Sequence, residues 1–281
     1  MTNANFEMFI VATPIGNLND ISKRAIETLN NSDLIICENP KHSLKLLNKL
    51  GIKKKLVSLH DYNENLVIKR LSNDLMNKKL ALISDAGSPL ISDPGYKLIQ
   101  FCIKNGAKVH SIPGPNSIIP ALQLSGIPID EFYFAGFLPK TDKHINDFID
   151  KIKNINLTSV FFVSSHKLKN CLVSLENKLP DRSISISKEL TKINEKTFRC
   201  IGSEINESVS INAENLKGEF VVVVGKNSMK KTESSNLEDY NEEIIKLLIK
   251  FSLTDVVEIV HKLTGITKNK IYKWALDLKK K

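Results

Sequence analysis

The sequence predicts an α/β protein with two α/β domains and a small helical module at its C-terminus. Short apolar runs alternate with segments of helical spacing over the first 128 residues, which is typical of a parallel sheet covered by helices. From about residue 130 several strands alternate apolar and polar residues, which indicates more antiparallel pairing. A polar stretch without apolar periodicity then precedes a last group of helical segments. We therefore expect an N-terminal domain at 1–128, a second domain at 129–226, a linker at 227–240 and a basic helical module at 241–281.

In the first domain, each predicted strand is followed by a predicted helix. Apolar runs predict strands at 8–13, 33–37, 56–59, 80–84 and 109–112, and helical spacing predicts helices at 21–29, 42–50, 65–76, 98–103 and 118–124. Asp20 is the expected N-cap of the first helix, and Gly51 is expected to end the second. Because strand and helix alternate, we expect a mostly doubly wound parallel sheet.

The second domain is predicted to mix strands of both directions. Its strands are expected at 132–137, 159–163, 183–187, 197–201 and 219–224, and its helices at 145–152 and 166–179. The C-terminal module should contain helices at 244–249, 253–263 and 266–278, with Thr254 and Thr267 as caps and a break at Gly265, an arrangement of the helix-turn-helix type. Tyr272 and Trp274 would point in different directions, so that one packs and the other is free to stack on a base.

Composition is that of an ordinary globular protein and favours a polyanionic partner. The chain has 281 residues, of which 42% are hydrophobic and 25% charged, and its net charge is +9. This charge favours nucleic acid above other partners. Between His261 and Lys281, seven Lys stand against one Asp, a charge of +6 over that stretch. An AT-rich genome would produce the same Lys and Asn bias, and a solvated tail would produce the same Lys-rich end.

Nothing in the sequence predicts a membrane segment, a disulfide framework or a metal site. The N-terminus lacks the pattern of a signal peptide, and no apolar run approaches the roughly 18 residues of a membrane helix. The four cysteines and six histidines have no metal-ligand spacing, and Cys37 and Cys102 are predicted core thiols. The glycine-rich motif of dinucleotide-binding sites and the P-loop are absent. We therefore expect a cytoplasmic protein without a metal.

The polar loop after the strand at 80–84 is the strongest local candidate for a binding site. Residues 84–95 hold two glycines, two prolines and two aspartates, where a parallel strand would reach the carboxyl edge of its sheet. Ligands of such sheets bind at this edge. Gly87 would let a backbone come close to a ligand, and Asp85 would offer its carboxylate to ribose hydroxyls. The alternative is a tight turn with a helix start at Ser92 to Gly95, in which Asp93 would cap the helix and Pro94 would take its first position.

Five motifs resemble, in the same order, those of the tetrapyrrole-methylase-like (class III) family of methyltransferases. They extend over about residues 8–226, and their combination is specific where any one alone is weak. The motifs are Val11-Ala12-Thr13-Pro14-Ile15-Gly16-Asn17-Leu18, Ser84-Asp85-Ala86-Gly87-Ser88-Pro89-Leu90-Ile91-Ser92-Asp93-Pro94-Gly95, Ile112-Pro113-Gly114-Pro115, Gly136-Phe137-Leu138-Pro139 and Lys188-Glu189-Leu190-Thr191-Lys192.

The resemblance implies a methyltransferase that uses S-adenosylmethionine. It implies two α/β domains with the cofactor in the cleft between them, and a homodimer. Within the family the motifs are most similar to those of members that modify RNA, which implies methyl transfer to the ribose 2′-hydroxyl of a cytidine in the decoding region of 16S rRNA. The expected partner is therefore 16S rRNA or the small ribosomal subunit, and the basic tail would add salt-sensitive affinity for it.

The resemblance also implies a set of cofactor-binding residues. An apolar slot, acceptors for a ribose and backbone groups are what this cofactor needs. For Ile91, Ile118 and Phe162 a place in the hydrophobic core is the alternative. The expected residues are Gly16, Asn17, Gly87, Ser88, Ile91, Ser117, Ile118 and Phe162, to which the strand-end argument above adds Asp85.

Two carboxylates are candidates for orienting the acceptor hydroxyl or taking its proton. Glu38 stands at a predicted strand end, and Glu189 lies beside Lys188. The alternative for Glu38 is to cap the following helix. His42 would titrate near neutral pH, but a place in the first helical turn suits a surface residue equally well. The expected RNA-binding residues are Lys41, Lys188, Lys192, Lys268, Lys270 and Lys273.

Two segments depart from the family pattern. The family usually has Glu-Asp-Thr-Arg-His-Thr where this chain has residues 38–43, Glu-Asn-Pro-Lys-His-Ser, and Glu-Ser-Pro-His-Arg where it has residues 163–167, Val-Ser-Ser-His-Lys. Acidic groups are thus lost at Asn39 and Val163, and Lys does not replace the two-pronged contact of Arg with a phosphate. Two other functions stay open: a family member acting on a tetrapyrrole or a protein side chain, and a degenerate relative that binds the ribosome without catalysis.

Overall fold

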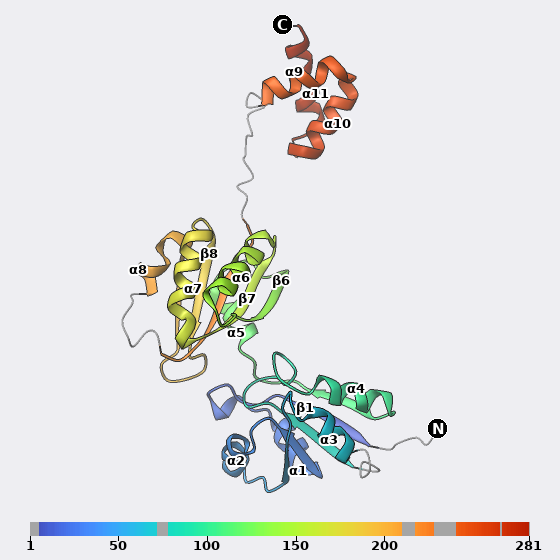
Figure 1. Ribbon diagram of the computed structural model, residues 1–281, viewed down its shortest axis with the longest axis vertical. Coiled ribbons are helices and arrows are strands. Elements are labelled where there is room, and N and C mark those ends of the chain that lie inside the picture. Colours follow the sequence, from blue (N-terminus) through green and yellow to red (C-terminus); the bar gives the residue numbers. More distant parts are fainter. Residues whose placement is uncertain (1–5, 72–77, 210–216, 228–239, 265, 281) are drawn as a thin grey trace. The chain divides into compact units, whose positions relative to one another are not determined.

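The computed structural model describes residues 6–71, 78–209, 217–227, 240–264 and 266–280, and Figure 1 labels its elements. Contacts between Cα atoms divide the chain into two compact units, Met1–Asn227 and Ser228–Lys281. The first unit holds two five-stranded sheets with their helices, and the second holds the C-terminal helices. None of the helices in these ranges combines the length and apolar character that crossing a bilayer requires.

The first sheet is entirely parallel, as predicted, with strand order β3-β2-β4-β1-β5. Because the strands run the same way, their carboxyl ends lie along one edge, where the loops that follow them gather. The strands are β1 (Glu7–Val11), β2 (Leu34–Cys37), β3 (Lys55–Ser58), β4 (Lys79–Ile83) and β5 (Lys108–Ile112).

Helices cover both faces of this sheet (Figure 1), which confirms the doubly wound arrangement. On β2, Ile35 and Cys37 pack with residues of α1 and α2, whereas Leu34 and Ile36 pack with residues of α3 and α4. The thiols of Cys37 and Cys102 are fully buried, as predicted. The helices are α1 (Lys23–Asn31), α2 (Pro40–Lys49), α3 (Glu64–Leu71) and α4 (Tyr96–Lys104), and a 3-10 turn, η1 (Leu18–Asp20), precedes α1.

Several predicted helix starts are wrong. Ser22, not Asp20, caps α1, because its hydroxyl accepts a hydrogen bond from the Ala25 amide at 3.1 Å. Helix α4 starts after Gly95, at the end of the expected range, so Asp93 does not cap it. A cap is defined by which oxygen reaches a free amide, and a spacing of one or two residues along the chain does not decide this. The predicted part of the third helix at 72–76 lies outside the described residues.

The second sheet has the order β6-β7-β10-β8-β9 and mixes directions, as predicted. Strand β6 runs parallel to β7, and the other neighbours are antiparallel. The strands are β6 (Phe132–Phe137), β7 (Thr158–Ser164), β8 (Ser183–Lys188), β9 (Lys196–Ile201) and β10 (Glu219–Val224). The helices that lie between these strands along the chain are α6 (Asp142–Asn154), α7 (Ser165–Lys178) and α8 (Ile205–Val209), with a 3-10 turn, η2 (Gly202–Glu204), before α8.

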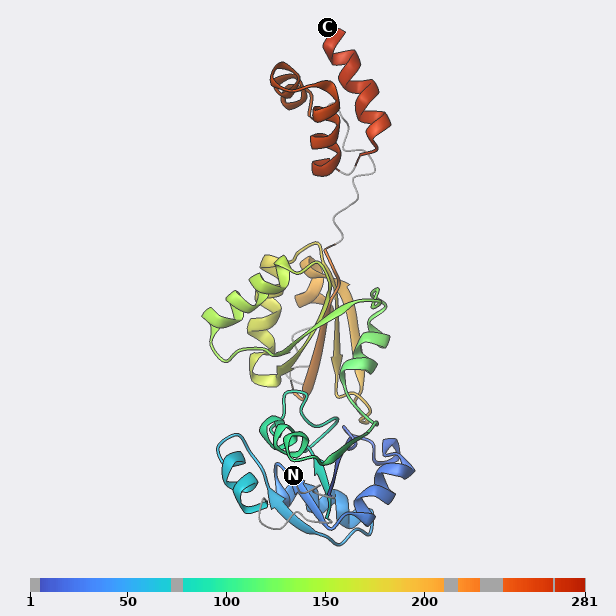
Figure 2. The same cartoon turned by 90° about the vertical axis from the view of Figure 1, so that its right-hand side faces the viewer.

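Both faces of the second sheet are covered (Figure 2). Helices α6, α7 and α8 pack on one face, where β10 contributes Phe220 and Val222. Helix α5 (Ile118–Ser125) packs on the other face, against Val221 and Val223 of the same strand. The chain therefore passes from the last strand of the first sheet directly into a helix that belongs to the core of the second.

The C-terminal unit is a bundle of α9 (Asn241–Lys250), α10 (Leu253–Thr264) and α11 (Lys268–Lys280) around its own apolar core. Trp274 packs against that core and donates its indole N–H to Asn241 Oδ1 at 2.8 Å, whereas Tyr272 is 45% exposed. The two aromatics thus differ as predicted. Ser252 rather than Thr254 caps α10, because its hydroxyl accepts from the Asp255 amide. The predicted linker at 227–240 falls mostly on residues outside the described ranges.

Glu64 caps a helix other than its own. Its carboxylate is 5% exposed and accepts a hydrogen bond from the Leu98 amide, in the first turn of α4, at 2.9 Å. The residue before α4 is Gly95, which has no side chain to serve this amide. A carboxylate at the N-terminus of α4 also interacts favourably with the partial positive charge of the helix dipole there.

Replacing Glu64 by Ala should lower the free energy of unfolding by about 1–3 kcal/mol, because a buried amide loses a charged acceptor. Urea unfolding of the full chain measures the change. As a control, Glu27→Ala removes an exposed ion pair with Lys23 and should change the free energy by less than about 0.5 kcal/mol. Equal stability of the two variants would show that Glu64 does not cap α4.

Candidate functional site

Backbone pairing joins the loops that follow β1 and β4. Thr13 and Gly87 exchange two amide-to-carbonyl hydrogen bonds, each 2.9 Å long. The Ser84 hydroxyl donates to the Gly87 carbonyl at 3.2 Å. Gly87 has φ +82°, a left-handed conformation that glycine adopts without strain. The loop predicted as a binding site is therefore fixed in place by backbone contacts.

The loop after β5 reaches the same place. A Cβ on Gly87 would lie 3.4 Å from Ile15 Cγ2 and 3.8 Å from the Pro115 carbonyl oxygen. The Ser88 hydroxyl donates to that carbonyl at 3.4 Å, and Ser117 precedes α5 two residues further on. The structure thus brings together the predicted cofactor residues of three strand ends around the Gly87 backbone.

The end of β2 adjoins Asp85. The Asn39 amide donates to Asp85 Oδ1 at 3.3 Å. The Asn39 side chain accepts from the amides of Lys41 and His42 at 3.1 and 3.4 Å and so caps α2. Asn is as good an N-cap as Asp, so this departure from the family pattern preserves the helix start. The capping role considered for Glu38 belongs to its neighbour.

Carboxylates gather at this edge of the sheet. Burial raises the pKa of Glu38, and the nearby charges of Asp85 and Asp61 raise it further. Burial also raises the pKa of Asp93 to about 6, with a further contribution from Glu38 and, after it, Asp85. The sequence indicated only a helix-capping role for Asp93, because the acidic residue that contributes most to its pKa, Glu38, follows a different strand. In the part of the chain that the structure describes, no three His, Cys, Asp or Glu side chains are placed to hold a metal ion.

The loop from Asp85 to Gly95 is strained in its second half. Leu90 has φ +73° and Ser92 has φ +68°, values that non-glycine residues rarely adopt. Ser92 Oγ lies 3.9 Å from where a Cβ on Gly136 would be, so this loop reaches β6 of the second sheet. Ile91, between the two strained residues, is 45% exposed, which excludes the core position considered for it.

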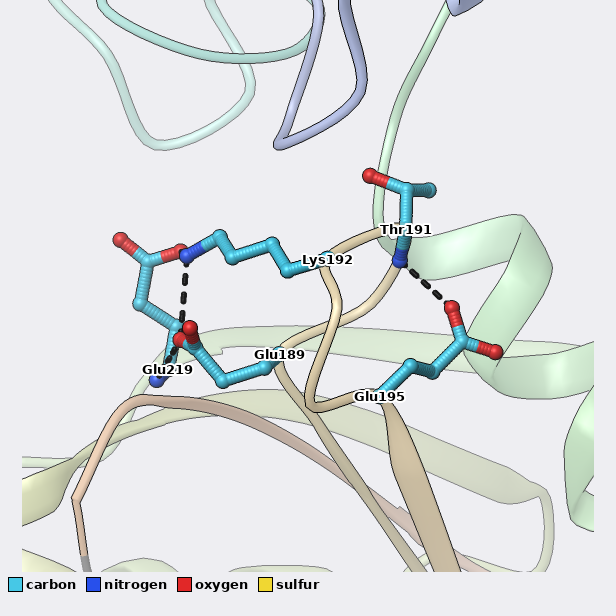
Figure 3. Close-up of polar contacts among 5 residues, drawn as sticks. All are labelled: Glu189, Thr191, Lys192, Glu195 and Glu219. Atoms are coloured by element: carbon cyan, nitrogen blue, oxygen red, sulfur yellow. Dashed lines mark hydrogen bonds and ion pairs between the residues drawn. The ribbon is translucent and has the colours of Figure 1, made fainter.

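A cluster of ion pairs holds the loop after β8 (Figure 3). Lys192 Nζ lies 3.0 Å from Glu189 Oε1 and 2.9 Å from Glu219 Oε2. Glu189 Oε1 also accepts a hydrogen bond from the Glu219 amide at 2.9 Å. Burial raises the pKa of Glu189, but that amide and the Lys192 ammonium outweigh it, so the pKa lies below its ordinary value. Glu189 and Lys192 are thus engaged with one another.

Gly16 lies directly against this loop. A Cβ on Gly16 would overlap Lys192 Cγ and would lie 2.9 Å from Thr191 Oγ1 and 3.2 Å from the Leu190 carbonyl oxygen. A residue with any side chain would therefore push the two loops apart. The side chain of Asn17 is turned to its own backbone, where it accepts from the Asn19 amide at 3.0 Å.

Half-buried apolar side chains lie beside these polar loops. Ile15, Ile118 and Phe162 pack together against the face of the second sheet that α5 covers. The Phe162 ring centroid is 5.1 Å from that of Phe134 and 5.0 Å from that of Phe137. Ile118 and Phe162 are thus at the border of the core and not in its middle. Apolar side chains beside convergent polar groups are typical of small-molecule sites.

The lysines predicted to bind RNA fall into three places. Lys41 is exposed in the first turn of α2, and Lys188 is half-buried at the end of β8, next to the ion-pair cluster that holds Lys192. Lys268, Lys270 and Lys273 are exposed on α11, in the C-terminal unit.

Comparison with known proteins identifies relatives of this chain. A model of the family described as tetrapyrrole (corrin/porphyrin) methylases matches residues 7–206. A protein of Vibrio cholerae named ribosomal RNA small subunit methyltransferase I is 37% identical over 277 residues, which are 96% of this chain and 94% of that protein. A protein of the same name from Halalkalibacterium halodurans is 42% identical over 225 residues, 79% of this chain and 77% of that protein.

A relative of the same name from Thermotoga maritima has a shorter chain. It is 40% identical over 205 residues, which are 73% of this chain and 90% of that protein. Its chain is therefore shorter than this one by about as many residues as the C-terminal unit contains. Among solved structures, a diphthine synthase is similar in fold, with a TM-score of 0.57 at 14% identity over 78% of this chain and 89% of that chain.

The raised pKa of Asp93 predicts a pH-dependent effect on stability. Its pKa of about 6 in the folded protein exceeds the ordinary 3.8, so the contribution of the protonated carboxyl is fully present below the ordinary value and is lost as the pH rises through about 6. Asp93→Asn should raise the free energy of unfolding near pH 8 by about 1–2 kcal/mol and change it little near pH 4. Thermal unfolding across this range measures both. Asp20→Asn, at an exposed site, is the control, and a gain that does not vary with pH would contradict the assignment.

Proposed function

This chain belongs to the tetrapyrrole (corrin/porphyrin) methylase family, and on that premise we propose that it uses S-adenosylmethionine to methylate the RNA of the small ribosomal subunit. The target we propose is the ribose 2′-hydroxyl of a cytidine in the decoding region of 16S rRNA. The observation that carries the proposal is the similarity, over nearly the full length of both chains, to several relatives named ribosomal RNA small subunit methyltransferase I.

The residues at the strand ends suit this cofactor. The apolar group of Ile15, Ile118 and Phe162 offers a surface for an adenine ring, and the Asp85 carboxylate offers acceptors for ribose hydroxyls. Gly16 and Gly87 leave the backbone open to close approach. We propose that the cofactor lies between the loops of the two sheets, with Asn17, Ser88, Ile91 and Ser117 around it. We also propose that the two sheets form two domains whose boundary lies before α5, and not at the expected residue 128, because α5 packs on the second sheet.

The protein's part in the reaction is mainly positioning. When bound, S-adenosylmethionine would supply a methyl group on a positively charged sulfur. The acceptor oxygen would bond to the methyl carbon, and the sulfur would leave on the opposite side. Holding the acceptor oxygen about 3 Å from that carbon, on the side away from the sulfur, provides much of the acceleration. A hydroxyl is a poor nucleophile, so a neighbouring group must orient it or accept its proton.

Glu38 fits the role of base or orienting group better than Glu189. Its raised pKa favours proton uptake, and Asn39 relieves it of capping α2. Glu189 has a lowered pKa and is occupied by Lys192 and the Glu219 amide. We therefore propose Glu38 as the catalytic carboxylate, with Glu189 in a supporting role.

The C-terminal unit is proposed to hold the RNA. Its exposed lysines on α11 suit phosphates, and the exposed ring of Tyr272 can stack on a base. Lys41 and Lys188 would add contacts from the first unit. The relative from Thermotoga maritima is shorter than this chain by about as many residues as the C-terminal unit contains, which supports our proposal that this unit adds affinity and is not part of the cofactor site. The protein is also proposed to be a cytoplasmic homodimer.

Two other functions were open on sequence grounds. The likeness to solved structures concerns the fold alone, so it does not favour a tetrapyrrole or protein substrate. Against a degenerate binder, both lost acidic groups have structural explanations: Asn39 caps α2, and Val163 is 2% exposed in the core of the second sheet. Neither substitution therefore implies lost catalysis.

The proposal is tested by incubating the purified full chain with methyl-labelled S-adenosylmethionine and small ribosomal subunits that lack the modification. Digestion of the 16S rRNA and mass spectrometry should find label in 2′-O-methylcytidine from the decoding region. Label on a base, in another region or in ribosomal protein would overturn the proposed target. Cofactor binding without any transfer would favour the non-catalytic alternative.

Glu38→Gln keeps the shape of the side chain and removes its charge. If Glu38 is the base, the single-turnover rate should fall by about 10²–10⁴-fold while the affinity for S-adenosylmethionine stays within about twofold. Quenched-flow methyl transfer and calorimetric titration measure the two quantities. Glu27→Gln, at an exposed position on α1, is the matched control. A near-normal rate in Glu38→Gln would exclude the base role.

A chain that ends at Asn227 should fold and bind S-adenosylmethionine as the full chain does, since the first unit has its own cores. It should lose most of its affinity for small subunits, and its binding should depend less steeply on salt because it releases fewer counterions. Filter binding across a salt series compares the two chains. Equal affinity and equal slope would show that the C-terminal unit does not grip RNA, and lost cofactor binding would place it in the cofactor site.

A further inference from the structure

The hydroxyl of Thr191 is buried without a partner. Among the described residues, Thr191 Oγ1 is one of few side-chain oxygens that are shielded from solvent and make no hydrogen bond. A buried polar atom in this state is costly, and proteins rarely leave one unpaired without a reason. In Figure 3 this hydroxyl points away from the carboxylates that fix the loop.

The backbone beneath this hydroxyl is strained. Thr191 has φ +66° and Glu189 has φ +50°, both in the left-handed region. That region is least suited to β-branched residues such as Thr, because the branched Cβ crowds the following carbonyl. Strained residues persist only where their surroundings over-determine them, and they concentrate at functional sites.

The surroundings do over-determine this loop (Figure 3). The Thr191 amide donates to Glu195 Oε2, and the Lys192 amide donates to the Glu189 carbonyl at 3.0 Å. The Lys192 ammonium joins Glu189 to Glu219, whose own amide donates to Glu189. These contacts fix the backbone on both sides of Thr191 and none of them uses its hydroxyl.

The hydroxyl faces the residues proposed for the cofactor. Thr191 Oγ1 lies 2.9 Å from where a Cβ on Gly16 would be. The preceding residue, Leu190, packs in the same apolar cluster as Ile15, Ile118 and Phe162. An oxygen held rigidly between a close backbone approach and an apolar surface is placed to specify a small ligand.

We propose that Thr191 is a binding residue for S-adenosylmethionine, and that its hydroxyl gains a hydrogen bond with a polar group of the cofactor when the cofactor binds. This inference rests on the proposed function. The ion-pair cluster of Glu189, Lys192 and Glu219 then acts as the support that holds the strained loop ready. Rotation about χ1, or a small withdrawal of Gly16, exposes the oxygen to the ligand without unfolding the loop.

The test is Thr191→Val, which keeps the β-branched shape and removes the hydroxyl. Without ligand, this variant should melt about 2–4 °C above the wild type, because an unpaired buried oxygen has been removed. Its affinity for S-adenosylmethionine and for S-adenosylhomocysteine, measured by calorimetry on the full chain without RNA, should fall by about 3- to 10-fold, the loss of one hydrogen bond. Thr191→Ser, which retains a hydroxyl, should bind within about twofold of the wild type.

Thr197→Val is the matched control on the neighbouring strand. The Thr197 hydroxyl is 3.3 Å from the Ser187 hydroxyl, so this variant should melt slightly below the wild type and bind the cofactor normally. If Thr191→Val melts lower and binds normally, the hydroxyl is structural and the inference is wrong. If the wild type itself does not bind S-adenosylmethionine, the proposed function fails, which is a different result.

Discussion

The ammonium of Lys192, held between the carboxylates of Glu189 and Glu219, is the contact on which the junction of the two sheets depends. It ties the loop after β8 to the first residue of β10, and it puts Lys192 Cγ and Leu190 O against Gly16. The pair with Glu189 is partly shielded from water, so its attraction is stronger than that of the pair with Glu219, whose side chain is 79% exposed. The strained backbone at Glu189 and Thr191 exists because this contact and the Glu195 carboxylate outweigh its cost.

The opposite electrostatic situation holds at the edge of the first sheet. There Glu38, Asp85 and Asp93 lie near one another, and burial together with the neighbouring carboxylates raises the pKa values of Glu38 and Asp93. Such an arrangement lowers the stability of the fold at neutral pH, which is common where a carboxylate must take up a proton. The two sets of carboxylates therefore differ: Glu189 and Glu219 are paired with Lys192, whereas burial and like charges raise the pKa values of Glu38 and Asp93.

Local pattern was enough to predict the strands, and contacts between distant segments decided the rest. Apolar runs predicted β6 and β10 with their ends, because a buried strand needs an unbroken or alternating run of such residues. Helix α5 was predicted as a helix, but its attachment to the second sheet was not, since a largely apolar helix can cover either sheet. The loops that contain Gly16 and Gly87 were predicted as binding loops because a glycine lets the backbone come close to a ligand or to another segment. The environment of Asp93 depends on Glu38, which is more than forty residues away along the chain. That of Thr191 depends on Gly16, also distant in sequence, and on a positive φ that no sequence pattern indicates.

The strand order of the second sheet has a consequence for the protein during its synthesis. Strand β10 is the last of the five to leave the ribosome, yet it is the central strand, with β7 on one side and β8 on the other. Until residue 224 has emerged, β7 and β8 have no strand between them, and Glu219 is missing from its place beside Lys192. The first sheet, complete at residue 112, can fold while the second is still being made. A nascent chain stalled between these two points would expose the unpaired edges of β7 and β8, and would be a natural target for chaperones until its last strand arrives.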